Sequence, residues 1–587
     1  MPGAPPLVAQ GGSQTHVSPA ADLGSQLESS LATPLPPKVA LSLGRMKPST
    51  RKATAWSRGL VDRLTDVASA QPATKTERLL QLARYPATLD TFVASSRRPP
   101  RSAPNRARTR RSKRALLQAK SGYLARAVNT LMCPEQSKSD EEVDRELAEL
   151  QAHPSPDGLE AFSWSDVPAA PLSSITISRK ILKKALGSLP ADKAPGPTGL
   201  SFLHLRVAYK IMRKELVAAL LPIVQAIIDG DNNYAIFSHS ILVPIPKKNG
   251  KLRPVAMGEA LRRIAAKAAA ETVLPKLREE VFVDQFGLGE SCGLERMVAI
   301  TRRHFDDGGT VLSLDLSNAY NTLSRDFLLR CVSTYCPALV DYVKGQYSSS
   351  LLLSTSGVVL RSEEGVQQGD PLSPLLFSLG MKPVLDRLRS IYNVRVVAYQ
   401  DDTYILTDRA SADEIAKTAK QLFSQVGMSL NLPKCVALIQ GAGHDTNLDR
   451  PDHVRRVGAH VITGVPVGPE SFVRGEVQRV VDKAALTLKA IADFSEDVGA
   501  EGVGPALSMI KFCVLPKIAH LMRNVDPTPE VLTPAETFCQ STLSDVVGKV
   551  LGRTLSPDIS QALGLPAKHG GLGFAMPTVV QWVLNFY

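Results

Sequence analysis

The spacing of apolar and polar residues along the 587-residue chain predicts most of its helices and strands. Apolar residues at helical spacing predict helices at residues 174–189, 262–277, 476–494 and 505–525. Apolar runs bounded by polar residues predict strands at residues 310–316 and in the two halves of 394–407. Two short runs on either side of a Lys-Asn-Gly turn predict a β-hairpin at residues 241–255.

The first part of the chain lacks a sustained period and is rich in proline, serine, alanine and glycine. Such a composition is typical of disorder, so we expect residues 1–115 to be mostly disordered, apart from a helical patch at residues 55–89. Three prolines argue against a long helix across residues 97–114. They are Pro99, Pro100 and Pro104.

Charge points to a polyanionic partner, since the formal net charge is +13. Residues 97–114 carry many basic residues and no acidic one, a pattern that fits contact with RNA, a nuclear-import address or a solvated linker. On this basis we expect a nuclear protein, with the cytoplasm as the alternative. The longest apolar stretch, residues 217–228, is too short to span a bilayer, so we expect no membrane association. The sequence leaves the oligomeric state open.

Three carboxylates lie where a metal site could form. Asp315 ends an apolar strand, and the adjacent Asp401 and Asp402 lie at the junction of two apolar strands. A bound dication would relieve the repulsion between the neighbouring carboxylates, and Mg²⁺ prefers such hard oxygen ligands. Each aspartate alone could equally be a turn residue or a helix cap, so the carboxylates suggest a metal site without settling it.

Several short motifs occur in a fixed order between residues 174 and 468. They are KAPGPTG (193–199), VPIPKKNGKLRPV (243–255), QFG (285–287), DLSNAY (315–320), GVQQGDPLSP (365–374), YQDD (399–402), GMSLN (427–431) and ITGVPVG (462–468). In this order they resemble the reverse transcriptases of retrotransposons, especially the non-LTR type and their group II intron relatives. Four positions depart from the family pattern: Thr198, Asn321, Gln400 and Thr463.

The resemblance implies a right-hand polymerase of mixed α/β (α+β) class, preceded by the largely disordered basic region. Fingers and palm, the latter an antiparallel sheet with helices, would occupy residues 174–440. The primer grip and a helical thumb would occupy residues 441–587, and residues 116–173 would form a helical linker or N-terminal extension.

The resemblance also implies the metal site. Two Mg²⁺ ions, for which Mn²⁺ could substitute, would be held by Asp315, Asp401 and Asp402. Lys434 would act as the general acid for pyrophosphate departure, and Gly464 would belong to the primer grip.

Further residues would bind the substrates, which are an RNA template, a DNA primer or RNA–DNA duplex, and dNTPs. Lys247 and Arg253 would hold the triphosphate. Tyr320 would exclude the 2′-hydroxyl, and Gln368 and Gly369 would contact the nascent base pair. The implied function is that of a retroelement RNA-directed DNA polymerase.

Two other interpretations stay open. The chain could be a catalytically silent or domesticated retroelement protein that binds RNA, although the intact Asp315, Asp401 and Asp402 count against this. It could also be a maturase or telomerase-like enzyme, which would need a specialised RNA-binding domain that the sequence does not reveal. We find no endonuclease, zinc-knuckle or RNase H pattern, which favours a truncated reading frame.

Overall fold

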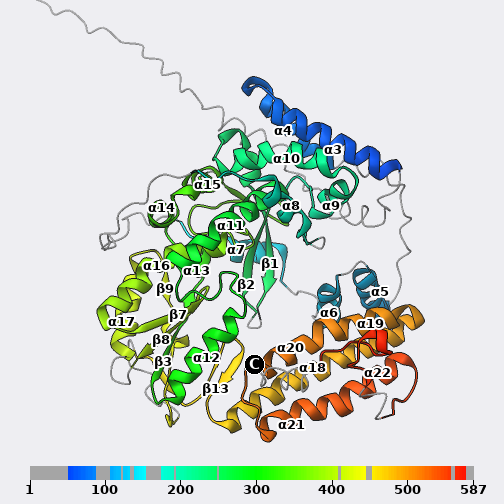
Figure 1. The fold of residues 1–587 in the computed structure, drawn as a ribbon, viewed down its shortest axis with the longest axis vertical. Coiled ribbons are helices and arrows are strands. Elements are labelled where there is room, and N and C mark those ends of the chain that lie inside the picture. The colour runs from blue at the N-terminus through cyan, green and yellow to red at the C-terminus, as the bar shows by residue number, and fades with distance from the viewer. Residues whose placement is uncertain are drawn as a thin grey trace, which may run out of the picture.

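The computed structural model, shown in Figure 1, combines two larger β-sheets and two two-stranded ones with many helices in the part of the chain that it describes. It describes residues 51–86, 106–120, 123–132, 138–153, 174–190, 193–247, 250–348, 350–407, 412–443, 453–556 and 562–576. The mixed α/β class predicted from the sequence is confirmed.

A five-stranded sheet lies at the centre of one half of the molecule, in the order β11-β10-β3-β8-β7. Its strands are β3 (Thr310–Leu314), β7 (Arg395–Tyr399), β8 (Asp402–Thr407), β10 (Val436–Leu438) and β11 (Arg455–Val457). The strands predicted at 310–316 and 394–407 are thus confirmed.

Both faces of this sheet are covered because its apolar side chains alternate. Leu312 and Val396 point into the core that α16 (Ser373–Tyr392) and α17 (Ala412–Ser424) share with the sheet. Val311 and Val397 belong to a separate core beneath α12 (Gly293–Asp306). A side-chain period of two therefore accounts for the helix layer on each side.

A second sheet has the order β2-β1-β5-β6. Its strands are β1 (Ser240–Pro246), β2 (Leu252–Gly258), β5 (Leu351–Ser354) and β6 (Val359–Arg361). The first two pair antiparallel from Ser240 opposite Gly258 to Pro246 opposite Leu252, which confirms the predicted hairpin. Two further pairs are β4 (Leu316–Ser317) with β9 (Ser429–Leu430) and β12 (His460–Ile462) with β13 (Val465–Val467).

Helices and short turns connect and cover the sheets. The helices are α8 (Arg179–Gly187), α9 (Phe202–Ile211), α10 (Arg213–Ile228), α11 (Ala260–Glu280), α13 (Ala319–Thr322), α14 (Arg325–Tyr335) and α15 (Val340–Tyr347). The 3-10 turns are η2 (Asn232–Ser238), η3 (Pro337–Leu339), η5 (Leu432–Lys434), η6 (Gly499–Gly502) and η9 (Ala567–His569). The helix predicted at 174–189 begins at Arg179, because Ser178 caps it by accepting from the amide of Ile181.

The helical patch predicted at residues 55–89, within the N-terminal region that was expected to be mostly disordered, corresponds to two helices. Helix α3 (Arg51–Ser69) packs against α9 and α10, and α4 (Pro72–Arg84) packs against α3 and η2. Trp56 is 1% exposed and stacks on Tyr85 with ring centroids 5.4 Å apart. Burial of a tryptophan and several leucines stabilises this helical pair on the body. Residues 1–50 and 87–105 lie outside the described residues.

Helices also occupy much of residues 106–153, where the sequence predicts a helical linker or N-terminal extension from residue 116, and these helices pack against the rest of the protein. Helix α5 (Arg106–Lys120) starts two residues after Pro104, so the prolines precede the helix rather than prevent one. It packs with α6 (Leu124–Met132) on the C-terminal helices, and α7 (Asp140–Glu149) packs on strand β2. The disorder expected up to residue 115 therefore does not apply from residue 106 onward.

The C-terminal bundle consists of five α-helices and two π-helical turns. They are α18 (Glu470–Val498), α19 (Val503–Met509), α20 (Leu515–Met522), α21 (Pro529–Thr537), α22 (Ser544–Leu551), η7 (Ile510–Val514) and η8 (Phe538–Leu543). The helix predicted at 476–494 is confirmed, and the one predicted at 505–525 is interrupted by η7.

One run of the described residues, Glu470–Met522, is long and apolar enough by length and composition to cross a membrane. It comprises α18 to α20, whose apolar faces form the core of the bundle. Buried core helices meet the same criterion.

Candidate active site

Strand pairing brings the predicted carboxylates together. Strands β3 and β8 run antiparallel with Leu314 opposite Thr403, so the next pair along the ladder is Asp315 and Asp402. Asp401 lies in the turn between β7 and β8. The three predicted metal ligands thus come from the end of β3, the start of β8 and the turn that joins β7 to β8.

The turn that carries Asp401 is held in a specific conformation. Gln400 has φ 60°, a left-handed conformation that is unusual for a residue other than glycine. Its amide donates to Oε1 of Gln285 at 2.8 Å, and its side-chain nitrogen donates to the carbonyl of Gly287 at 2.6 Å. Gln285 and Gly287 belong to the QFG motif, so that motif supports the carboxylate turn.

Burial, together with neighbouring charges, raises the pKa of two of these carboxylates. Burial, followed by the charges of Asp401 and Asp315, raises the pKa of Asp402 to about 6. Burial is also the main cause that raises the pKa of Asp401, with the charge of Asp315 adding to it and Arg253 and Lys247 opposing it. Both side chains still reach solvent, so the surrounding protein desolvates them without closing the site.

This donor set fits a divalent cation that substrate phosphates help to bind. Within the described residues, no three carboxylate, histidine or cysteine side chains form a ready-made metal cluster. Three hard oxygen donors, of which Asp401 and Asp402 have raised pKa values, nevertheless form a site that positive charge would stabilise. Mg²⁺ commonly binds through one or two carboxylates plus phosphates rather than a complete protein cage.

Lys434 lies beside the first carboxylate. Its Nζ is 3.3 Å from Oδ2 of Asp315, and the Lys434 side chain is 63% exposed. The short β4–β9 pair and the hydrogen bond from the Asn431 amide to the Asp315 carbonyl, at 2.8 Å, fix this segment against the strand end. The predicted general acid is therefore within reach of the carboxylates.

The β1–β2 hairpin brings its basic residues to the same place. Burial, followed by the charges of Arg253, Lys434 and Lys251, lowers the pKa of Lys247, and Asp315 opposes that shift. Lys247 and Arg253 also act to lower the pKa of Asp401, so the two cations are near enough to influence that carboxylate.

Tyr320 is held at the edge of the site by two contacts. Its ring stacks on Phe377 of α16 with centroids 4.4 Å apart and an interplanar angle of 12°. Its hydroxyl donates to Oε1 of Gln400 at 3.0 Å. Gln400 therefore links Tyr320 to the carboxylate turn, a role that the sequence did not reveal.

The loop that carries Gln368 and Gly369 lies against strand β2. The carbonyl of Gln368 accepts from the amide of Ala256 at 2.7 Å. Gly369 has φ 114°, and a Cβ there would lie 2.5 Å from the carbonyl oxygen of Ala256. Only glycine fits this close backbone approach.

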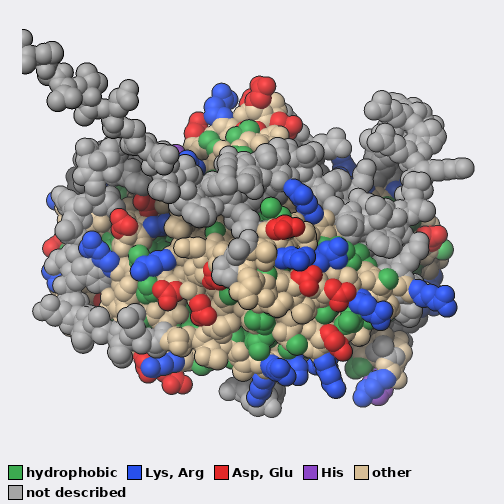
Figure 2. Space-filling model, turned by 90° about the horizontal axis from the view of Figure 1, so that it is seen from above, with side chains coloured by type: hydrophobic (Ala, Val, Ile, Leu, Met, Phe, Trp, Pro, Cys, Tyr) green, Lys and Arg blue, Asp and Glu red, His purple; other side chains and the backbone are tan. Residues whose placement is uncertain are grey.

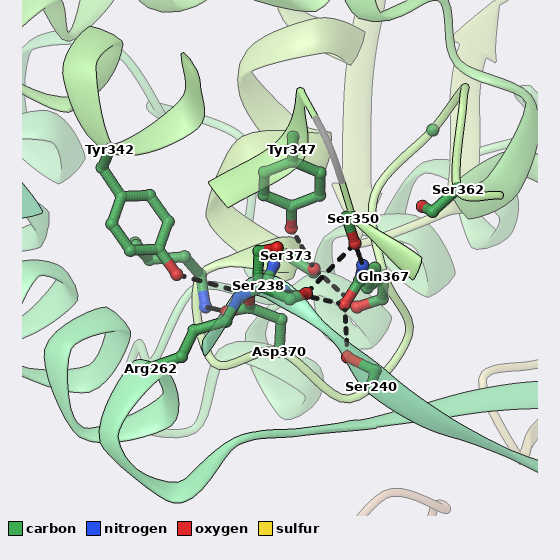
Figure 3. Close-up of polar contacts among 12 residues, drawn as sticks. Ser238, Ser240, Arg262, Tyr342, Tyr347, Ser350, Ser362, Gln367, Asp370 and Ser373 are labelled. Carbon is green, nitrogen blue, oxygen red and sulfur yellow. Dashed lines mark hydrogen bonds and ion pairs between the residues drawn. The ribbon is translucent and has the colours of Figure 1, made fainter. Parts of the chain in front are cut away.

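A buried polar network contacts the two residues that flank Gln368 and Gly369, which are Gln367 and Asp370 (Figure 3). Arg262, 1% exposed, donates from Nη1 to the Ser238 carbonyl at 2.6 Å and to Oε1 of Gln367 at 3.0 Å. Its Nη2 lies 2.8 Å from Oδ2 of Asp370, an ion pair without hydrogen-bond geometry. Tyr342 donates to the same carboxylate oxygen at 3.4 Å.

Sequence reasoning missed this network. Gln367 and Asp370 lie inside the quoted GVQQGDPLSP motif, and Arg262 begins the predicted helix 262–277. An arginine among alanines and leucines at a helix start was the available signal. Its partner could not be read from the sequence, because about a hundred residues separate the two charges.

The glycine predicted to belong to the primer grip lies in a separate hairpin. Gly464, with φ 90°, lies with Thr463 in the turn between β12 and β13. Thr463 contacts Tyr404 on β8 through its backbone, so this hairpin lies on the α12 side of the sheet. Among the described contacts, none joins Gly464 to the carboxylates.

Helix α7 also reaches the site, which the sequence did not predict. The carbonyl of Leu150, just after α7, accepts from the side-chain nitrogens of Asn318 at 2.8 Å and Asn321 at 3.1 Å. Glu146 on the same helix accepts from the amide of Leu252 at 2.6 Å. The helix therefore joins the DLSNAY segment to the basic hairpin.

Comparison with known families agrees with this geometry. Residues 245–461 match the family described as reverse transcriptase (RNA-dependent DNA polymerase). These residues form a reverse transcriptase domain. It contains Asp315, Asp401 and Asp402, and the resemblance inferred from the motifs is confirmed.

Curated retroelement proteins extend the similarity beyond the reverse transcriptase domain. The chain is 26% identical over 418 residues to the retrotransposable element SLACS 132 kDa protein of Trypanosoma brucei gambiense, covering 68% of this chain and 33% of that protein. It is 25% identical over 318 residues to a Pol polyprotein from retrotransposable element R2 of Popillia japonica, covering 50% and 44%. The R2DM polyprotein of Drosophila melanogaster is 26% identical over 376 residues, covering 58% and 34%.

The chain thus covers between 33% and 44% of the length of these relatives. As a class, reverse transcriptases use divalent metal ions and act on an RNA template, a nucleic-acid primer and dNTPs.

Proposed function

We propose that this protein is the RNA-directed DNA polymerase of a retroelement, and that it adds dNTPs to a primer 3′-hydroxyl. The observation that carries the proposal is the convergence of carboxylates and cations. Asp315 and Asp402 are neighbours at the ends of paired strands. The positive charges of Lys247 and Arg253 act to lower the pKa of Asp401. Nucleotidyl transfer needs this combination, because the triphosphate requires cations and the metal ions require carboxylates.

In this proposal Asp315, Asp401 and Asp402 hold two Mg²⁺ ions, for which Mn²⁺ could substitute. When bound, such ions activate the attacking hydroxyl and stabilise the leaving pyrophosphate. Lys247 and Arg253 neutralise the triphosphate, since arginine can bind phosphate oxygens through two nitrogens. Lys434 gives a proton to the departing pyrophosphate, a role suited to a lysine beside Asp315.

The same proposal assigns the parts of a right-hand polymerase. The five-stranded sheet with α12, α16 and α17 is the palm, and the sheet that contains β1 and β2 belongs to the fingers. The C-terminal bundle is the thumb, and the β12–β13 hairpin that carries Gly464 is the primer grip. Gln368 and Gly369, close to β2, contact the nascent base pair.

The test is primer extension by the full chain on a defined RNA template with all four dNTPs and Mg²⁺. We expect extension that EDTA abolishes and that added Mg²⁺ restores. Binding of the template is measured in parallel. A folded protein that binds RNA and extends no primer would favour the domesticated, non-polymerising alternative.

Tyr320 is expected to select deoxynucleotides. Its ring is fixed by Phe377 and Gln400, so it can exclude a 2′-hydroxyl by occupying its space. Tyr320→Ala should raise the relative kcat/KM for ribonucleotides by roughly tenfold or more, as expected when a steric contact of this size is lost. Competitive incorporation of rNTP and dNTP measures the ratio.

The matched control is Tyr320→Phe, which retains the ring and removes the hydrogen bond to Gln400. It should retain sugar selectivity if the ring acts by its bulk. Equal selectivity of the wild type and Tyr320→Ala would remove Tyr320 from this role.

A further inference from the structure

The basic helix α5 is anchored on the C-terminal bundle and is not a free arm. Ala115 and Ala119 are buried in the same core as α18 and α19. Ser112 donates to Oδ2 of Asp497 at 2.8 Å, and Lys120 pairs with Glu501 beyond the end of α18. In Figure 1, α5 and α6 lie on the side of the bundle that faces the two-sheet body.

The exposed side of this helix carries unpaired positive charge. The sequence of α5, RARTRRSKRALLQAK, has seven basic residues and no acidic one. Arg111, Lys113 and Arg114 are exposed, as is Arg126 on α6. Among the described residues, no carboxylate forms an ion pair with any of these four side chains.

Another face of the same bundle has a different character. A groove between α18 and α22 is lined by Asp482, Asp493, Glu496 and Asp545, against only Lys489 and Lys549. Such a surface repels phosphates. Basic and acidic side chains are also interspersed on the face seen in Figure 2, which is viewed from the side where α10 lies. The concentration of one charge on α5 is thus a local feature.

We propose that α5 and the start of α6 form a second nucleic-acid site, which binds the phosphate backbone of the RNA–DNA duplex beyond the polymerase site. The inference rests on the proposed function, because that function supplies the duplex. Arginine and lysine side chains on a fixed helix neutralise phosphates without reading sequence. Packing on the bundle means that the helix meets the duplex already ordered, so binding does not have to order it.

This site would explain why a highly basic segment is fixed by small buried residues. Placing alanines and Ser112 against the bundle leaves the long cationic side chains on the opposite side of the helix. A free import address or a solvated linker would need no such packing. The geometry therefore favours a duplex partner over these two alternatives.

The decisive experiment measures duplex binding by the full chain in EDTA, by fluorescence anisotropy over a range of salt concentrations. The variant is the triple substitution Arg111→Gln, Lys113→Gln and Arg114→Gln. We expect affinity for a long RNA–DNA duplex to fall roughly tenfold or more. The slope of log K against log salt should decrease in magnitude by about 3, because each lost phosphate contact contributes about 1. The loss should diminish as the duplex is shortened.

The matched control replaces three exposed lysines elsewhere, Lys210, Lys214 and Lys417, by glutamine. The control has the same change in net charge as the α5 variant. Equal loss of affinity in both triple variants would therefore contradict a specific site on α5, and unchanged binding by the α5 variant would also contradict it. A defect confined to nuclear accumulation would instead identify an import address. Extension of a primer by one nucleotide at saturating substrate reports the proposed function separately, and both variants should retain it.

Discussion

Replacing Asp401 by alanine is expected to abolish primer extension. The charges of Asp315, Arg253 and Lys247 all act on the pKa of Asp401, so this carboxylate is near the groups proposed to bind metal and triphosphate. Its loss removes a proposed metal ligand and leaves the two cations without their counter-charge. We expect kcat to fall by roughly a thousandfold or more, because metal ions supply several kcal/mol of transition-state stabilisation. Single-nucleotide extension under saturating dNTP measures the effect.

Binding of RNA should be nearly unchanged in the same variant, since one carboxylate contributes little to phosphate affinity. Asp307→Ala is a matched control, because Asp307 is an exposed carboxylate whose partner is Arg303 on the surface of α12. Such a pair contributes little, so this variant should retain activity. Equal activity of Asp401→Ala and Asp307→Ala would remove Asp401 from the metal site. Joint loss of synthesis and RNA binding would contradict the separation of the two roles.

The sequence predicted those parts of the site that depend on local pattern. Asp315 and the Asp401–Asp402 pair end apolar strands, and such strands align their ends when they pair. The β1–β2 hairpin was equally local, because its turn residues and alternation lie within one short segment. In each case the signal and the structure extend over the same few residues.

What the sequence could not reveal are contacts between distant segments. Nothing in the composition of residues 106–120 shows that alanines would anchor them to a bundle that begins at Glu470. The sequence of α7 likewise has the pattern of a surface helix. In the structure the carbonyl of Leu150, just after α7, accepts hydrogen bonds from Asn318 and Asn321. Tertiary packing decides such positions, and local propensity carries no information about it.

The buried ion pair of Arg262 and Asp370 is the clearest of these distant contacts, and its disruption has a large expected cost. Burial disfavours the charged form of Arg262, yet Asp370 raises the pKa of that arginine above its ordinary value. Asp370→Ala would therefore leave a charged guanidinium buried without its partner. We expect the free energy of unfolding to fall by about 3–5 kcal/mol, the usual effect of breaking a buried pair.

Urea unfolding followed by circular dichroism measures this loss. The matched control is Lys382→Ala, which breaks the partly exposed pair between Lys382 and Asp386, 2.7 Å apart. Partly exposed pairs contribute about 0–1 kcal/mol, so this variant should be nearly as stable as the wild type. Equal destabilisation by the two substitutions would show that burial of the Arg262–Asp370 pair does not increase its contribution to the free energy of unfolding.

Removing both charges together tests the cause of the loss. The double variant Arg262→Met with Asp370→Leu leaves no unpaired charge, and apolar side chains of similar volume often replace a buried pair at little cost. It should therefore recover most of the stability that Asp370→Ala loses. The loop of Gln368 and Gly369 would still lack the contacts from Arg262 to Ser238 and Gln367. We expect this stable double variant to show a raised KM for dNTPs, which distinguishes support of the nucleotide site from support of the fold. A wild-type KM in the folded double variant would limit the network to a structural role.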